Sequence, residues 1–266
     1  MQEAPMTDKI LSRKDGAVGH LIFNNPERHN AVSLDMWEAT EAVVADFKAD
    51  RNIRAMVVSG AGGKAFVSGA DISRFEKDRS TEEAVKRYSV IVERAYAAFY
   101  DFPKPTIAMI RGYCIGGGMA LAMCCDMRIC SDNSKFGIPA AKLGLGYGFK
   151  GIKRLVDVVG PSFAKEIFYT ARQFTAEEAE RMGLVNRVVP SETLEQYVAD
   201  YTATMAANAP LTVDSVKFII GEVVKPDSER DLAACEAMVQ ACFASEDYKE
   251  GRKAFMEKRK PNFTGA

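Results

Sequence analysis

Residues Thr106–Ser131, TIAMIRGYCIGGGMALAMCCDMRICS, contain the most informative pattern of this sequence. The apolar runs Ile107–Ile110 and Met127–Cys130 predict buried strands, and Met119–Cys125 predicts a helix that follows three consecutive glycines. Glycines between a strand and a helix permit positive φ angles and let a ligand approach the backbone. The first amides of the helix lack internal partners, so they favour negative charge. The pattern predicts either a backbone oxyanion hole or a tight turn without a ligand.

The composition predicts one substantial α/β core with a helical appendage. The chain has 266 residues, of which 47% are hydrophobic and 27% charged, and its formal net charge is -1. Because non-specific nucleic-acid binding needs a basic surface, this charge argues against a nucleic-acid partner.

The cysteines and the N-terminal residues indicate a reducing compartment. Six cysteines occur without a CxxC pair or a nearby histidine, so we expect reduced thiols and no metal site. The first residues, MQEAPMTDKI, have no apolar signal core, and no window approaches the ~18–20 apolar residues of a membrane span. We therefore expect a soluble cytoplasmic protein that has no membrane partner.

Strands and helices alternate along the first half of the chain. Val18–Phe23 and Ala55–Val58 predict strands. Between them, Ser33 is placed to cap a helix whose apolar residues recur at helical spacing. This order with short connections predicts an α/β fold with a largely parallel sheet.

Further helices are predicted after the first strands, and from Ser191 onward the pattern is helical almost to the end. Ser80 and Glu83 form the pattern of a capping box for a helix to about Tyr100. The later elements expected are helices at Ser162–Thr170 and Thr175–Met182, a strand at Leu184–Val189, and helices from Ser191 onward with breaks near Pro210 and Pro226. We place a boundary near residue 200, between a core of residues 1–200 and a helical part of residues 201–266.

Six separated segments together resemble the enoyl-CoA hydratase/isomerase (crotonase) superfamily. They are NNPERHNAVSLDMW, KAFVSGADISRF, RGYCIGGGMALAMCCDMRI, KFGIPAAKLGLGYG, FTAEEAERMGLVNRVVP and EGRKAFMEKRKPNF. The resemblance covers nearly the whole chain in family order. It implies a crotonase-like ββα spiral core, a helical C-terminal trimerisation region, and a homotrimer or dimer of trimers. It also implies an acyl-CoA substrate, with coenzyme A as part of that substrate and no separate cofactor.

The resemblance also assigns the oxyanion hole. Its two donors are the backbone N–H groups of Ala70, in SGADI, and Gly117, with Gly116 beside it. Such donors stabilise the charge that forms on a thioester carbonyl oxygen as an enolate develops.

Coenzyme A contacts are implied at two places. The loop SGADISRF runs along the pantetheine and adenine in the family, which assigns substrate contacts to Asp71, Ile72 and Arg74. Arg74 is alternatively a solvated surface charge, and Asp71 a residue that orders the loop. Phe255 and Lys258 match family residues that approach the adenine nucleotide from the same or a neighbouring subunit. A basic helix end that complements the helix dipole would also explain the lysines.

The sequence departs from the family at the two glutamates that hydratases use as general acid and base. The corresponding positions, which would line the substrate site, are Ala120 in GGGMALA and Ala140 in FGIPAAK. Since each general acid or base contributes typically ~10²–10⁴-fold, standard hydration is doubtful. Isomerases retain the second glutamate, so simple proton shuttling is doubtful as well.

Tyr147 is a candidate catalytic residue. The stretch AKLGLGYGFKGIKRL is similar to the methylmalonyl-CoA decarboxylase branch, where a tyrosine lies at this spacing, although that branch has histidine in place of Ala70. Tyr147 is alternatively a packing residue. The other polar candidates, which we interpret as structural or surface groups, are His20, His29, Asp126, Lys142 and Lys150.

Three functions therefore remain open. The first is an acyl-CoA enzyme of the hydratase/isomerase group, the second a decarboxylase of a malonyl-type CoA that uses Tyr147, and the third a non-catalytic acyl-CoA binder. Ile138, Met119 and the helix over residues 80–100 are expected to shape the acyl site.

Overall fold

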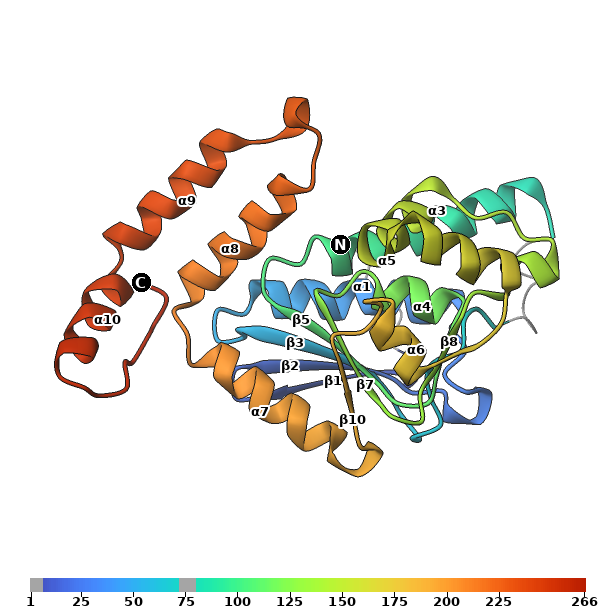
Figure 1. Ribbon diagram of the computed structural model, residues 1–266, viewed down its shortest axis with the longest axis horizontal. Coiled ribbons are helices and arrows are strands. Elements are labelled where there is room, and N and C mark those ends of the chain that lie inside the picture. The colour runs from blue at the N-terminus through green and yellow to red at the C-terminus, as the bar shows by residue number, and fades with distance from the viewer. Residues whose placement is uncertain (1–6, 72–79) are drawn as a thin grey trace.

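The larger of two β-sheets forms the centre of the protein. The computed structural model describes residues 7–71 and 80–266 (Figure 1). The larger sheet has the order β1-β2-β3-β5-β7-β10, with β1 at Ile10–Asp15, β2 at Val18–Phe23, β3 at Ala55–Gly60, β5 at Thr106–Ile110, β7 at Met127–Ser131 and β10 at Arg187–Val189. Only β1 and β2 pair antiparallel within this sheet. The prediction of a largely parallel sheet is confirmed.

The smaller sheet makes the chain wind as a spiral. It has the order β4-β6-β8-β9, with β4 at Ala65–Val67, β6 at Tyr113–Ile115, β8 at Lys135–Gly137 and β9 at Phe174–Thr175. The strands β3, β5 and β7 of the larger sheet are each followed along the chain by β4, β6 and β8 of the smaller sheet. The helices after these pairs are α3 at Glu82–Tyr100, α4 at Gly117–Ala122 and α5 at Phe149–Thr170. The repeating unit is therefore two strands and a helix.

Side chains are buried on both faces of the larger sheet. Met56 and Val58 of β3 belong to the main core, which also contains residues of α1 (Leu34–Ala49). Val57, which points to the opposite face, packs with Leu194 and Val198 of α7 (Leu194–Ala206). This two-sided burial explains why the strands are continuous apolar runs. Residue 200, the proposed border of the core, lies inside α7.

Helix caps agree only partly with the sequence pattern. Helix α3 is capped by Thr81, whose hydroxyl accepts from the Ala84 amide at 3.1 Å, so the predicted Ser80–Glu83 capping box is wrong. Ser33 occupies the N-cap position of α1, but its buried hydroxyl has no hydrogen-bond partner among the described residues.

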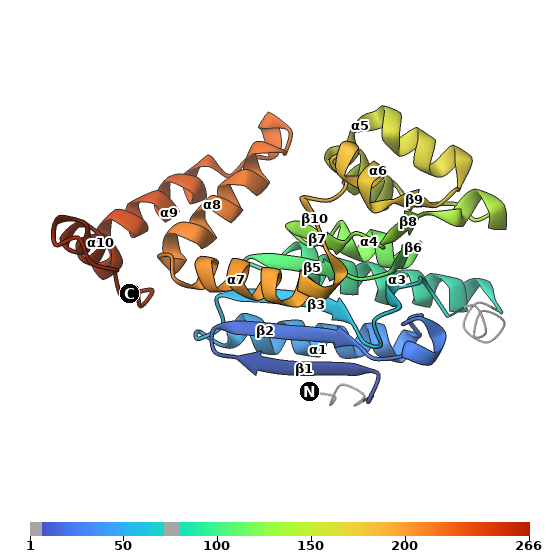
Figure 2. The same ribbon diagram turned by 60° about the horizontal axis from the view of Figure 1, so that its bottom comes forward.

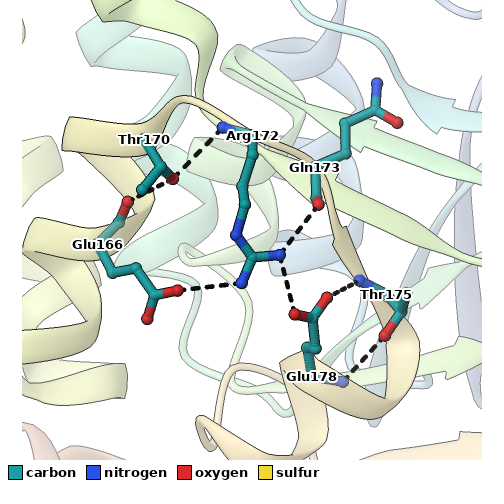
Figure 3. A network of polar contacts seen from close by, with 6 residues as sticks. All are labelled: Glu166, Thr170, Arg172, Gln173, Thr175 and Glu178. Atoms are coloured by element: carbon teal, nitrogen blue, oxygen red, sulfur yellow. Dashed lines mark hydrogen bonds and ion pairs between the residues drawn. The ribbon is translucent and has the colours of Figure 1, made fainter.

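The predicted capping box of α6 (Ala176–Arg181) is confirmed. The Thr175 hydroxyl accepts from the Glu178 amide at 3.2 Å, and the Glu178 carboxylate accepts from the Thr175 amide at 2.8 Å. Arg172 joins this cap to the end of α5, because its guanidinium contacts Glu178 at 2.8 Å and Glu166 at 3.0 Å (Figure 3). The network fixes α6 against the helix that precedes it.

Helix α5 is longer than predicted. Only its second half was expected, yet it starts at Phe149 and is interrupted at Gly160, where φ is 73°. The first half matters for function because it lies beside the cavity described below.

The C-terminal helices form an arm beside the core. They are α8 at Pro210–Val223, α9 at Leu232–Ala244 and α10 at Glu246–Met256. Helices α8 and α9 pack against each other, and α10 lies at the end of the arm that is farthest from α3 and α5 (Figures 1 and 2). Arg54 ties the segment after α10 to the core by donating to the Phe263 carbonyl oxygen at 2.5 Å, and it also donates to the carbonyl oxygen of Ala206, the last residue of α7, at 2.7 Å.

All six cysteines are free thiols, as expected for a reduced protein. No described helix is both long enough and apolar enough to cross a membrane.

Candidate active site

A cavity of about 630 Å³ lies between α3, the glycine turn before α4 and the start of α5. Its described lining is mostly apolar side chains and exposed backbone. Along α3 the lining residues recur at helical spacing and are Val85, Tyr88, Ser89, Val92, Glu93 and Tyr96. A mostly apolar cavity with a few polar groups is typical of a small-molecule site.

The two predicted oxyanion donors lie next to each other in the cavity wall. A Cβ atom built on Gly117 would be 3.8 Å from the Ala70 nitrogen, and one built on Gly69 would be 3.6 Å from the Gly117 nitrogen. Within residues 7–71 and 80–266, neither the Ala70 nor the Gly117 N–H donates a hydrogen bond to the protein. The structure therefore brings two free amides together, whereas the Gly116 amide donates to the Gly137 carbonyl at 2.8 Å.

Backbone conformation explains one glycine of this turn, and close packing explains another. Gly116, the N-cap of α4, has φ 56° and ψ -115°, a conformation that favours glycine. A Cβ on Gly118 would lie 2.0 Å from the Val67 carbonyl oxygen, so no other residue fits there without a shift of the backbone.

Tyr96 holds the turn from the side of α3. Its hydroxyl donates to the Gly117 carbonyl oxygen at 3.0 Å, and its ring lies edge-on to Trp37 at 5.0 Å between centroids. Burial raises the pKa of Tyr96 well above its usual value, so the hydroxyl stays protonated and keeps donating. Sequence analysis did not identify Tyr96 as a site residue. The signal that could have found it is its helical spacing from Val92 and Glu93, which places the three residues on one face of the helix.

Both alanines that replace the hydratase glutamates line the cavity. Ala120 lies one turn into α4, and Ala140 lies in the short 3-10 helix Pro139–Leu143, where it is 5% exposed. Neither can transfer a proton. Among the described lining residues the only carboxylate is that of Glu93.

Tyr147 also lines this cavity. Its ring packs edge-on against Phe168 at 4.9 Å between centroids, so the residue does pack against the core. Burial raises the pKa of its phenol to about 12. No described group hydrogen-bonds the hydroxyl, so a protonated donor is available to a ligand.

The predicted coenzyme A loop is described only at its start. The Asp71 carboxylate is buried and contacts Arg28 at 3.3 Å, and its amide donates to the Val32 carbonyl at 3.0 Å. These contacts fix the position of Asp71 beside Ala70. Ile72 and Arg74 lie outside the described residues.

Phe255 and Lys258 lie away from the cavity within one chain. Phe255 is in α10, at the far end of the arm, where its side chain is 83% exposed (Figure 2). Lys258 follows the same helix. Neither residue is among the described lining residues of the cavity in its own chain.

The remaining polar candidates mostly have structural surroundings. The Asp126 carboxylate accepts from the Thr106 amide at 2.7 Å and pairs with Lys217 at 2.8 Å. His29 stacks on Tyr113, and burial lowers the pKa of His20 in β2. Of the residues expected to shape the acyl site, Ile138 lines the cavity, whereas Met119 is buried elsewhere.

Glu93, Lys150 and Arg154 form an ionic cluster that sequence analysis missed. Lys150 is 69% exposed, in agreement with its interpretation as a surface charge, and it also lines the cavity together with Arg154 one turn later on α5. Both cations contact the Glu93 carboxylate, at 3.3 Å each. Only the packing of α5 on α3 brings these charges together, and sequence spacing does not reveal that packing.

These features define the protein as an α/β protein of the crotonase fold with a cavity beside a glycine-rich helix start. The family model described as enoyl-CoA hydratase/isomerase matches residues 13–266. The chain belongs to this family of enzymes, whose members act on acyl-CoA thioesters.

Named relatives and solved structures agree with this assignment. The chain is 37% identical to a crotonyl-CoA hydratase of Syntrophomonas wolfei over 257 residues, which is 96% of this chain and 98% of the relative. It is 35% identical to a short-chain-enoyl-CoA hydratase of Clostridium acetobutylicum over 253 residues, covering 95% and 96% of the two chains. The crystal structure of an enoyl-CoA hydratase/carnithine racemase from Magnetospirillum magneticum is similar with a TM-score of 0.92 at 35% identity, covering 100% of this chain and 98% of that chain.

Proposed function

We propose that this enzyme binds an acyl-CoA thioester and stabilises its enolate between the N–H groups of Ala70 and Gly117. The observation that carries the proposal is the position of these two free amides, side by side in the wall of a mostly apolar cavity. Removal of one such donor typically costs roughly 10²–10³ in rate, so the pair supplies a large part of the stabilisation that enolate chemistry needs.

The same cavity argues against ordinary hydration. Addition of water across a double bond needs groups that activate the water and protonate the carbon, and the two expected positions are Ala120 and Ala140. Each missing acid or base lowers the hydration rate by typically ~10²–10⁴-fold. Although a relative is named as a crotonyl-CoA hydratase, we therefore expect this chain to hydrate crotonyl-CoA very slowly or not at all.

A turnover screen combined with calorimetry tests the proposal. Purified protein is incubated with a mixture of acyl-CoA esters, and products are identified by mass spectrometry. We expect heat of binding with at least one ester and turnover of a compound that passes through an enolate. Absence of heat with every ester would overturn the proposal, and rapid hydration of crotonyl-CoA would show that the glutamate argument is wrong.

A second candidate function is decarboxylation of a malonyl-type CoA, which Tyr147 favours. Its phenol lines the cavity, stays protonated because its pKa is raised to about 12, and has no hydrogen-bond partner among the described residues. Such a donor could orient the leaving carboxylate. The bond between that carboxylate and Cα breaks and CO₂ leaves. The electron pair of the broken bond remains on the thioester as the enolate, which then takes a proton from water at Cα.

Release of CO₂ from malonyl-CoA and methylmalonyl-CoA tests this candidate. If it is right, Tyr147→Phe lowers the rate, whereas Tyr169→Phe, at a tyrosine that is 77% exposed, leaves it unchanged. No CO₂ from either ester, with Tyr147→Phe behaving as wild type, removes decarboxylation. Tight binding of esters without any turnover would instead favour a non-catalytic acyl-CoA binder.

We also propose a homotrimer or dimer of trimers, in which Phe255 and Lys258 of one subunit approach the adenine nucleotide held by another. The support is the exposure of Phe255 and the position of its helix, α10, at the end of the arm that is farthest from α3 and α5 (Figure 2). The free thiols agree with a cytoplasmic location, which we likewise propose.

A further inference from the structure

The cavity that holds the two free amides has one charged region. Among its described lining residues the charged side chains are Glu93 of α3 and Lys150 and Arg154 of α5. The others are apolar, aromatic or small. An unsubstituted fatty acyl chain gives such a cluster nothing to bind, so the cluster requires an explanation.

The geometry leaves both cations incompletely paired. Arg154 Nη2 and Lys150 Nζ contact the same carboxylate atom, Glu93 Oε1, each at 3.3 Å. Charge-assisted hydrogen bonds are normally shorter, about 2.7–2.9 Å, so neither contact is optimal. Two cations face one carboxylate, and the region therefore has an excess of one positive charge.

The charge of Arg154 is partly removed from water. Its side chain is only 12% exposed, and its guanidinium lies 5.1 Å from the centroid of the Tyr100 ring. Burial of an incompletely paired cation is unfavourable unless an anion completes the pairing. The next basic residue of α5, Lys153, is by contrast paired with Asp157 at 2.6 Å, and neither of these two residues is among those described as lining the cavity.

The charged region lies within reach of a bound acyl group. Glu93 is three residues before Tyr96 on α3, a rise of about 4.5 Å along the helix, and Tyr96 contacts Gly117. A thioester carbonyl held by Ala70 and Gly117 would therefore lie in the same cavity as the cations, about one turn of α3 from Glu93.

We propose that the substrate's acyl group carries a second carboxylate and that Arg154 and Lys150 bind it. The guanidinium supplies a planar pair of donors that matches a carboxylate, and Lys150 adds a second charge from the next turn of α5. Glu93 aligns the two cations when the cavity holds no substrate. This inference rests on the proposed binding of an acyl-CoA thioester and names its substrate class.

Calorimetric titration with two esters of equal carbon number tests the inference. Glutaryl-CoA carries the second carboxylate, and valeryl-CoA ends in a methyl group. We expect the wild-type protein to bind glutaryl-CoA at least tenfold more tightly. Arg154→Gln should abolish this preference, and Lys150→Gln, at a side chain that is 69% exposed and tolerant of change, should reduce it.

Two further variants separate ligand recognition from a structural role. Glu93→Gln removes the competing carboxylate, so it should increase the preference for glutaryl-CoA, which loss of a merely structural ion pair would not do. Lys153→Gln removes a charge from the same helix outside the described cavity lining and should leave the preference unchanged.

The outcomes distinguish this inference from the proposed function. Equal or tighter binding of valeryl-CoA by the wild type would overturn the inference and leave acyl-CoA binding intact. A preference for glutaryl-CoA that persists in both Lys150→Gln and Arg154→Gln would also overturn it. Binding of neither ester would overturn the proposed function, and the inference with it.

Discussion

One hydroxyl group positions the backbone on which the proposed chemistry depends. The Tyr96 hydroxyl donates to the Gly117 carbonyl, and the free amide of Gly117 lies beside that of Ala70. A Cβ on Gly117 would lie 3.2 Å from the same hydroxyl, so a larger residue there would push the tyrosine hydroxyl away from its present position. At the residue scale the candidate site is therefore a packing arrangement, and the reactive groups that we propose come from the main chain.

We expect Tyr96→Phe to impair both stability and turnover. It leaves the Gly117 carbonyl without its donor, which typically costs about 1–3 kcal/mol of unfolding free energy. It also lets the glycine shift, and since a well-placed oxyanion donor contributes ~10²–10³-fold, we expect kcat to fall by about tenfold. Urea unfolding and steady-state kinetics measure the two effects. Tyr169→Phe is the matched control, and a Tyr96→Phe protein equal to wild type in both assays would contradict the assignment.

The two alanines allow a gain-of-function test. We expect the double variant Ala120→Glu with Ala140→Glu to hydrate crotonyl-CoA at least ~10²-fold faster than the wild type, because each carboxyl group supplies an acid or base beside the free amides. Spectrophotometric loss of the enoyl absorbance measures the rate. The same double change to Gln adds similar volume without an acid, so an equal gain in that protein would show that shape, not proton transfer, limits hydration.

At the scale of the elements, patterns confined to one segment were predictable and contacts between segments were not. The capping box of Thr175 and Glu178 depends on residues three apart, and it forms as expected. The first half of α5 was missed because the preceding stretch contains several glycines, whereas the contacts of this half with the core are made by Leu155 and Val159.

The same distinction applies to the candidate site. Gly117 and Ala70 were predictable because a glycine turn and a family motif indicate backbone function directly. Glu93 and Arg154 were not, since their meeting depends on the angle at which two helices pack. Phe255 shows the converse, because its sequence motif predicts a ligand contact, whereas the residue is exposed and does not line the described cavity of its own chain.

The end of α10 provides a prediction about pH. The Glu250 carboxylate accepts from Arg259 at 2.6 and 2.9 Å and from the Asn262 amide at 2.9 Å, and these bonds lower its pKa to about 2. Because the pKa is lower in the folded protein than its ordinary value of 4.5, this stabilisation is fully present above that value. It is lost as the pH falls toward 2.

We therefore expect the segment after α10 to detach progressively as the pH falls from 5 to 2. Hydrogen exchange of the peptide containing Asn262, corrected for intrinsic rates, should show declining protection. Glu250→Gln should remove that protection already at pH 7, whereas Glu246→Gln, which breaks the exposed pair with Lys249, should not. Unchanged protection in Glu250→Gln would show that other contacts hold the segment.

At the scale of the whole molecule, the arm has an apolar surface that the core does not cover. Val216, Ile220 and Val223 lie along one stripe of α8 at helical spacing, and they are 50%, 59% and 62% exposed. Few contacts tie the arm to the core, among them those of Arg54 and the Lys217–Asp126 pair. A stripe of this kind indicates an interface with another protein surface, and the proposed trimer supplies a second copy of the arm.

We expect the protein to sediment at three or six times its chain mass of 29.2 kDa. Ile220→Asp introduces a charge that would have to be buried in the interface, so it should shift the protein to the mass of one chain. Val90→Asp makes a comparable change on α3, at a valine that is 62% exposed, and should leave the assembly intact. Analytical ultracentrifugation measures both. If Phe255 and Lys258 reach a ligand only across subunits, the dissociated Ile220→Asp protein should also bind acyl-CoA esters more weakly, and undiminished affinity in a verified monomer would contradict a shared site.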